Sequence, residues 1–106
     1  MNIKQPLYKN KSKVKTLYVL DQGPNYSVEI TQYTGIESSN QNDIILDLMR
    51  IGLVERDCKR RKHNKKIVSL SLIGKKAVKL LKERQDILNR VNKIEKLINS
   101  VEGEEG

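Results

Sequence analysis

The last third of the chain repeats apolar residues every three and four positions over about four heptads. Eight of the nine positions on this seam are apolar, and Arg84 is the exception. Such a repeat is typical of a helix that pairs with another helix in a coiled coil. A helix from about Leu72 to Ser100 would form a rod of roughly 43 Å. A body of about 60 residues cannot cover such a rod, so we expect a homodimer, with parallel and antiparallel pairing both open. The predicted dimer interface comprises Ala77, Leu80, Arg84, Ile87, Val91, Ile94, Ile98 and Val101.

A basic segment lies between two short apolar segments. Residues 59–66 read Lys-Arg-Arg-Lys-His-Asn-Lys-Lys, with six positive charges and no apolar side chain. The flanks at 53–56 and 67–70 are typical of strands, which predicts a hairpin with this segment as its solvent-exposed tip. Like charges packed this densely repel each other and become favourable beside a polyanion such as DNA. A plain solvated loop is the alternative.

Composition supports a nucleic-acid partner and excludes several other classes. The chain has 106 residues and a net charge of +8. One cysteine, Cys58, and one histidine, His63, form neither an internal disulfide nor a metal site, so we expect no cofactor. There is no phosphate-binding glycine loop and no nucleophile–base pair, so we do not expect an enzyme. No apolar run is long enough to span a bilayer, and we expect a cytoplasmic, nucleoid-associated protein.

The first half of the chain has the pattern of three helices. Residues 1–11 form a predicted basic N-terminal arm. Ser12 is expected to cap a first helix that Gly23-Pro24 stops. Ser27 is expected to cap a second helix that ends at a left-handed Gly35. The second helix should bury the apolar side chains at its helical spacing, with an aromatic packed on its start; these are Val28, Ile30, Tyr33 and, at the start, Tyr26.

A third helix begins at Ser38 or Ser39 and ends at Gly52, with an apolar stripe toward the core. The stripe consists of Ile44, Ile45, Leu48, Met49 and Ile51. Ser71 should cap the final helix. These signals divide the chain into an arm (1–11), a globular domain (12–72), a coiled-coil helix (73–101) and a disordered acidic tail (102–106).

Three local sequences resemble the winged-helix DNA-binding domains of prokaryotic regulators. Residues 26–36 resemble the second helix and turn, and residues 48–56 resemble the end of a recognition helix and the entry to a wing. Residues 68–77 resemble a wing strand running into a helix that begins with Ser71 and has Gly74 three residues on. The last helix is similar to the dimerisation helix of MarR, PadR and ArsR-like groups. The resemblance implies a mainly α fold with a small β-hairpin wing. The Ile- and Lys-rich composition favours an archaeal, virus- or plasmid-borne protein.

The predicted DNA contacts lie on the third helix and the hairpin. The first turns of a recognition helix enter the major groove, where Asn and Gln can pair with adenine. The predicted base-reading residues are Ser38, Ser39, Asn40, Gln41 and Asn42. The predicted backbone and wing contacts are Arg50, Lys59, Arg60, Arg61, Lys62, His63, Asn64, Lys65 and Lys66. Helix capping and surface chemistry are the alternative for the Ser/Asn/Gln cluster. The N-terminal lysines, Lys9, Lys11, Lys13 and Lys15, are a second candidate group.

The leading hypothesis is a homodimeric, sequence-specific double-stranded DNA-binding transcription regulator, with repression by promoter occlusion. An architectural nucleoid or plasmid-partition protein with weak sequence preference is the alternative. A protein-interaction adaptor is a further alternative, which the basic hairpin disfavours. No small-molecule effector is evident from the sequence.

Overall fold

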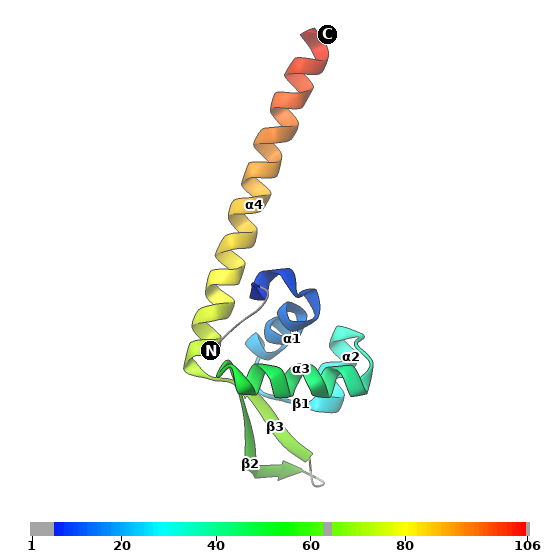
Figure 1. Ribbon diagram of the computed structural model, residues 1–106, viewed down its shortest axis with the longest axis vertical. Coiled ribbons are helices and arrows are strands. Elements are labelled where there is room, and N and C mark those ends of the chain that lie inside the picture. The colour runs from blue at the N-terminus through cyan, green and yellow to red at the C-terminus, as the bar shows by residue number, and fades with distance from the viewer. Residues whose placement is uncertain (1–5, 63–64, 106) are drawn as a thin grey trace.

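The computed structural model describes residues 6–62 and 65–105, with side chains for residues 6–57 and 67–101. A globular body lies at one end of a long helix, and the molecule extends over 65 × 29 × 23 Å (Figure 1). The elements in chain order are η1 (Leu7–Lys9), α1 (Lys11–Asp21), β1 (Asn25–Tyr26), α2 (Ser27–Thr34), α3 (Ser38–Arg50), β2 (Val54–Lys62), β3 (Lys65–Leu70) and α4 (Leu72–Glu105). The predicted mainly α fold with a small wing is confirmed.

The core lies where α1, α2, α3, the sheet and the first turns of α4 meet. Its buried apolar side chains come from every one of these elements. They are Leu17, Leu20, Ile30, Ile45, Leu48, Leu53, Val54, Val68, Leu70 and Val78. The predicted stripe of α3 is confirmed, because Ile45 and Leu48 are buried and its other members pack against the core.

Asn10, and not Ser12, caps α1. The Asn10 side chain accepts a hydrogen bond from the Lys13 backbone N–H at 3.1 Å. Ser12 lies inside the first turn, where its carbonyl accepts from the Thr16 hydroxyl. Asn and Ser cap helices about equally well, so the helix can be capped at the earlier of the two residues, which is Asn10.

A two-residue strand, β1, was not predicted. Asn25 and Tyr26 pair with Val68 and Ile67 of β3, which makes a three-stranded antiparallel sheet in the order β1-β3-β2. Tyr26 is therefore part of the sheet and also occupies the N-cap position of α2, while Ser27 is the first helical residue and not the cap. A strand this short carries no periodicity that a sequence pattern could show.

The prediction that α2 buries three side chains was wrong for two of them. Ile30 is fully buried, whereas Val28 is 52% exposed and Tyr33 is 73% exposed. The eight-residue helix lies at the edge of the body, so only a narrow side of it meets the core. Gly35 ends the helix with φ +72°, as predicted, and this left-handed conformation turns the chain into α3.

The hairpin strands are longer than predicted. β2 and β3 pair in register from Val54 opposite Leu70 to Lys62 opposite Lys65, with one irregularity between Asp57 and Arg61. Most of the basic segment is therefore strand and not tip loop, because ladder hydrogen bonds join backbone groups whatever the side chains. The hairpin projects beyond the body, opposite to α4 (Figure 1).

The start of α4 is anchored to the end of α3. The Ser71 hydroxyl accepts from the Gly74 N–H at 3.0 Å and donates to the Gly52 carbonyl at 2.6 Å. The predicted cap is thus confirmed, and it also links α4 to the turn before the wing. The helix continues to Glu105, whereas the sequence predicted a disordered tail from residue 102.

Candidate nucleic-acid interface

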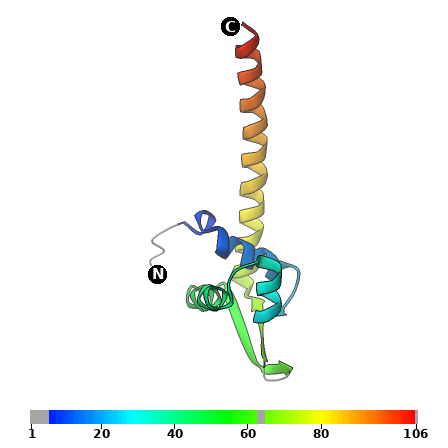
Figure 2. The same cartoon turned by 90° about the vertical axis from the view of Figure 1, so that its right-hand side faces the viewer.

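The outward face of α3 carries four side chains in one stripe. Ser39, Asp43, Leu46 and Arg50 are spaced four, three and four residues apart, which places them on one side of a helix. All four are exposed; Leu46 is 40% exposed. The helix is seen nearly end-on in Figure 2, on the outside of the body and above the wing. A helix presented in this way can enter a DNA groove.

Gln41 is not available to read bases, which corrects its prediction. It is 1% exposed, and its amide nitrogen donates to the Thr16 hydroxyl at 2.9 Å. Its amide oxygen accepts from the Thr34 hydroxyl at 2.6 Å. The same hydroxyl accepts from the Ile36 N–H. Gln41 therefore connects α1, α2 and α3 inside the core.

The other predicted base readers are exposed, but they do not all lie together. Ser38, Ser39 and Asn42 lie on the solvent side of α3. Asn40 is turned toward the start of α1, where it lines a shallow hollow with Asn10 and Lys13. Of the predicted base readers, Ser39 therefore belongs to the outward stripe and Asn42 lies beside it.

Arg56, which the sequence reasoning missed, joins the wing to α3. Its guanidinium donates to the Asn42 amide oxygen at 3.4 Å, from the base of β2 to the first turns of α3. This contact links the two elements expected to touch DNA. Leu46 was also missed, although its position opposite the buried Ile45–Leu48 side of α3 is readable from helical spacing.

The acidic residues of α3 reduce its positive charge. Asp47 pairs with Arg50 at 3.5 Å and with Lys13 of α1 at 4.0 Å. Asp43 is exposed beside them. The stripe is close to neutral, so any strong attraction to phosphate must come from another part of the molecule.

The wing carries the concentrated positive charge. The strand register places Arg61 opposite Lys66 and Lys62 opposite Lys65. The six positive charges of residues 59–66 favour a bound polyanion. The side chains predicted here lie outside the described residues; they are Lys59, Arg60, Arg61, Lys62, His63, Asn64, Lys65 and Lys66.

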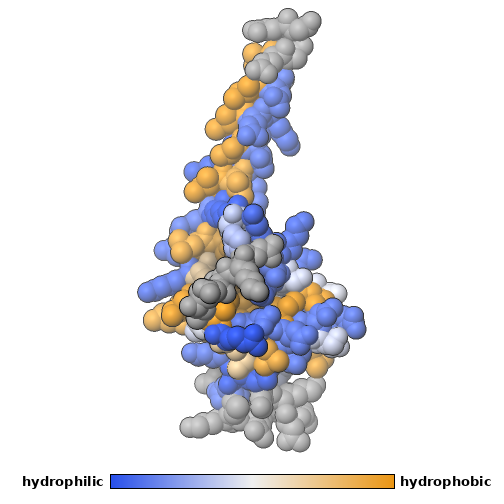
Figure 3. Space-filling view, viewed as in Figure 1, coloured by the Kyte–Doolittle hydropathy of each residue, from blue (hydrophilic) through white to orange (hydrophobic). Residues whose placement is uncertain are grey.

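An apolar stripe follows α4 beyond the body. Its predicted members are largely solvent-exposed, at 63% for Leu80, 59% for Ile87 and 57% for Ile94. Figure 3 shows the stripe along one edge of the upper part of the helix. Ala77 differs, because it is partly buried against the body's own core. Arg84 lies over the ring of Tyr8, with 3.5 Å between its Cζ and the ring centroid.

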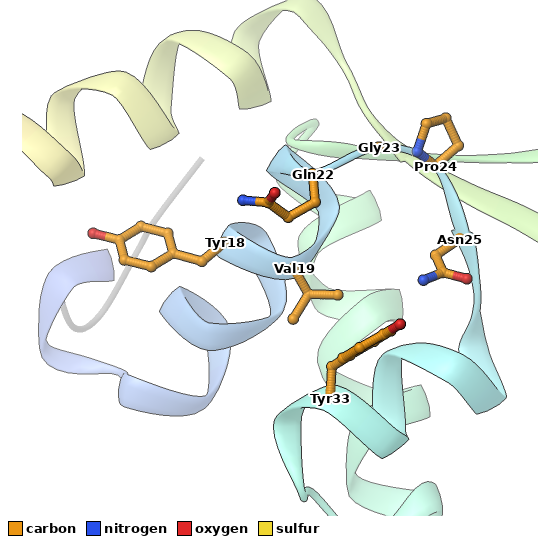
Figure 4. Close-up of a pocket in the computed structure, with 7 residues that line it drawn as sticks. All are labelled: Tyr18, Val19, Gln22, Gly23, Pro24, Asn25 and Tyr33. Atoms are coloured by element: carbon orange, nitrogen blue, oxygen red, sulfur yellow. The ribbon is translucent and has the colours of Figure 1, made fainter.

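A shallow pocket of about 580 Å³ lies between the end of α1 and α2. The Tyr33 ring points toward Asn25, and Tyr18 points away from both (Figure 4). Among the described residues no group of His, Cys, Asp and Glu is arranged to hold a metal ion. None of the helices described is long and apolar enough to cross a membrane.

No protein-family model and no curated protein matches the chain. Solved structures do. MepR, a transcription regulator of the Staphylococcus aureus multidrug efflux pump MepA, has a TM-score of 0.72 at 17% identity, over 80% of this chain and 64% of its own. BpsR of Bordetella bronchiseptica, whose DNA binding is regulated by 6-hydroxynicotinic acid, has a TM-score of 0.65 at 20% identity, over 76% and 58%.

A further match is the homodimeric winged helix-turn-helix DNA-binding domain of Mb0332 from Mycobacterium bovis. Its TM-score is 0.58 at 22% identity, over 76% of this chain and 69% of its own. The fold of the chain is therefore a winged helix-turn-helix, as the resemblance implied. The chain spans roughly three fifths of the length of BpsR and MepR.

Proposed function

We propose that the chain is a sequence-specific double-stranded DNA-binding transcription regulator that acts as a homodimer and represses by occluding a promoter. The observation that carries the proposal is the exposed stripe of α3 beside a wing with cross-strand basic pairs. In this arrangement α3 enters the major groove and the wing follows the flanking backbone or minor groove.

The chemistry of the stripe suggests which base edges it contacts. Asn42 can pair with adenine, and the carboxylate of Asp43 can accept from the amino group of cytosine. Leu46 provides an apolar contact for a thymine methyl. Because none of these three groups is positively charged, they discriminate between bases and the wing supplies most of the affinity.

The apolar stripe of α4 supports a second copy of the chain as the partner. Val91, Ile98 and Val101 remain 42–56% exposed in one copy, and pairing removes such groups from water. The homodimeric state of the Mb0332 domain supports the same assembly. A dimer suited to one palindrome would place its two α3 helices about 34 Å apart.

The test is selection from random duplexes at two salt concentrations, followed by sequencing. We expect an enriched palindrome with half-sites about one helical turn apart. Binding without an enriched sequence, but with a steep salt dependence, would favour the architectural alternative. Absence of duplex binding at low salt would contradict both and leave the adaptor. The expectation of no small-molecule effector stays a prediction.

A further inference from the structure

Arg84 interrupts the apolar seam of α4 at a position where pairing would bury it. It occupies an a position between Leu80 and Ile87, which are 63% and 59% exposed. A partner helix laid on these neighbours would also cover Arg84. Taking an unpartnered guanidinium out of water is costly, so the seam needs a group to accompany this charge.

The N-terminal turn η1 supplies such a group. The Tyr8 ring lies 3.5 Å from the Arg84 Cζ, and Leu7 next to it packs against the core. None of the ion pairs among residues 6–57 and 67–101 involves Arg84. A planar, weakly hydrated guanidinium stacks well on an aromatic face and keeps part of that stabilisation when water is removed.

Tyr8 is also placed to meet a partner. It remains 40% exposed although it touches a seam residue. Figures 1 and 2 both show η1 beside the lower half of α4, near the point where the helix leaves the body. A second copy aligned on Leu80 and Ile87 would therefore approach the exposed edge of this ring.

We propose that the N-terminal turn is part of the dimer interface, in which Tyr8 stacks on Arg84 and allows the seam charge to be covered by a second copy. The proposal rests on the proposed homodimer. It assigns residues 7–9 to assembly.

The experiment measures the dimer dissociation constant of the full chain by sedimentation over a dilution series. The variants are Tyr8→Ala, Arg84→Leu and their combination, with Tyr33→Ala as a matched control for an exposed tyrosine. We expect Tyr8→Ala to weaken the dimer roughly tenfold in the native background. In the Arg84→Leu background the same change should matter by less than about twofold, because the charge is gone. Tyr33→Ala should leave dimerisation unchanged.

The outcomes separate this proposal from the one it rests on. A native chain that is monomeric at every concentration contradicts the homodimer itself. A stable dimer that is indifferent to Tyr8→Ala, or weakened equally in both backgrounds, overturns only the role of the stack. Circular dichroism checks that each variant folds. If Tyr8→Ala does not fold, Tyr8→Phe should dimerise like the native chain and Tyr8→Leu should not, since only the first keeps an aromatic face.

Discussion

Leu46 is an apolar side chain on the otherwise polar outward stripe of α3. We predict that it contacts a single methyl group of a thymine. We expect Leu46→Ala to weaken binding to a selected duplex about fivefold. Replacing the contacted thymine by uracil, which removes only the methyl, should weaken the native protein by a similar factor and leave the variant nearly unaffected. Fluorescence anisotropy with matched thymine and uracil duplexes measures both.

The control for Leu46 is Val28→Ala, another exposed apolar residue, which lies on α2 and should not affect the thymine–uracil difference. If replacing thymine by uracil lowers the affinity of the Leu46→Ala variant as much as that of the native chain, Leu46 does not contact the methyl group.

For Gln41 we expect effects on stability and not on DNA binding, because its side chain is buried. In Gln41→Met, the Thr16 and Thr34 hydroxyls can still donate to the carbonyls of Ser12 and Thr31, so we expect unfolding free energy to change by less than about 1.5 kcal/mol. Gln41→Ala, which leaves a cavity, should cost about 2–4 kcal/mol. Urea denaturation measures these values. The preferred DNA sequence should be the same for Gln41→Met and the native chain; a changed base preference would restore Gln41 as a base reader.

At the scale of elements, the junction of α3, β2 and α4 depends on one glycine. A Cβ built at Gly74 would lie 2.0 Å from the carbonyl oxygen of Leu53. Alanine favours a helix over glycine by about 1 kcal/mol, but overlap with backbone cannot be relieved by a rotamer change. We therefore expect Gly74→Ala to destabilise the fold by about 3 kcal/mol. Thermal unfolding measures it, with Lys76→Ala, at an exposed position of the same helix, as control.

The Gly74 prediction has a clear contrary result. If Gly74→Ala melts at or above the temperature of the native chain, helix propensity dominates at this position and the start of α4 can move away from Leu53. The hydrogen bonds of Ser71 would then constrain the start of α4 less than the helix propensity of residue 74 does.

At the scale of the whole molecule, the proposed pairing of α4 would bring two bodies onto DNA together. Ile94→Glu places a charge on the exposed seam, and we expect it to weaken the dimer by at least roughly a hundredfold. Binding to a two-half-site duplex should fall with it, while binding to a half-site should not. Asn89→Glu makes the same charge change on the opposite side of the helix and is the matched control.

Sedimentation and anisotropy on the two duplexes measure both quantities for each variant. An Ile94→Glu variant that stays dimeric would show that the stripe is covered in some other way. One that is monomeric and still binds the long duplex at native affinity would separate dimerisation from DNA binding.

Several features of the fold could be predicted because their signals are local. Gly35 and Gly52 turn the chain with positive φ, and Ser71 with Gly74 marks the entry to α4. The apolar spacing of α3 predicted which of its sides packs against the core. In each case the residues that decide the conformation lie within a few positions of each other, so the sequence pattern predicts it.

Tertiary structure decided the rest, because it depends on what distant residues place next to a given side chain. Gln41 and Asn42 are chemically similar neighbours, yet one is inside because Thr16 and Thr34 lie around it and the other is outside. Tyr33 follows a helical stripe but faces solvent because none of the described elements covers that side of α2. By itself, the sequence determined that helices form in these regions, that the chain turns at Gly35 and Gly52, and that α4 carries an apolar repeat. The packing of remote segments determined which polar groups of the candidate interface remain exposed.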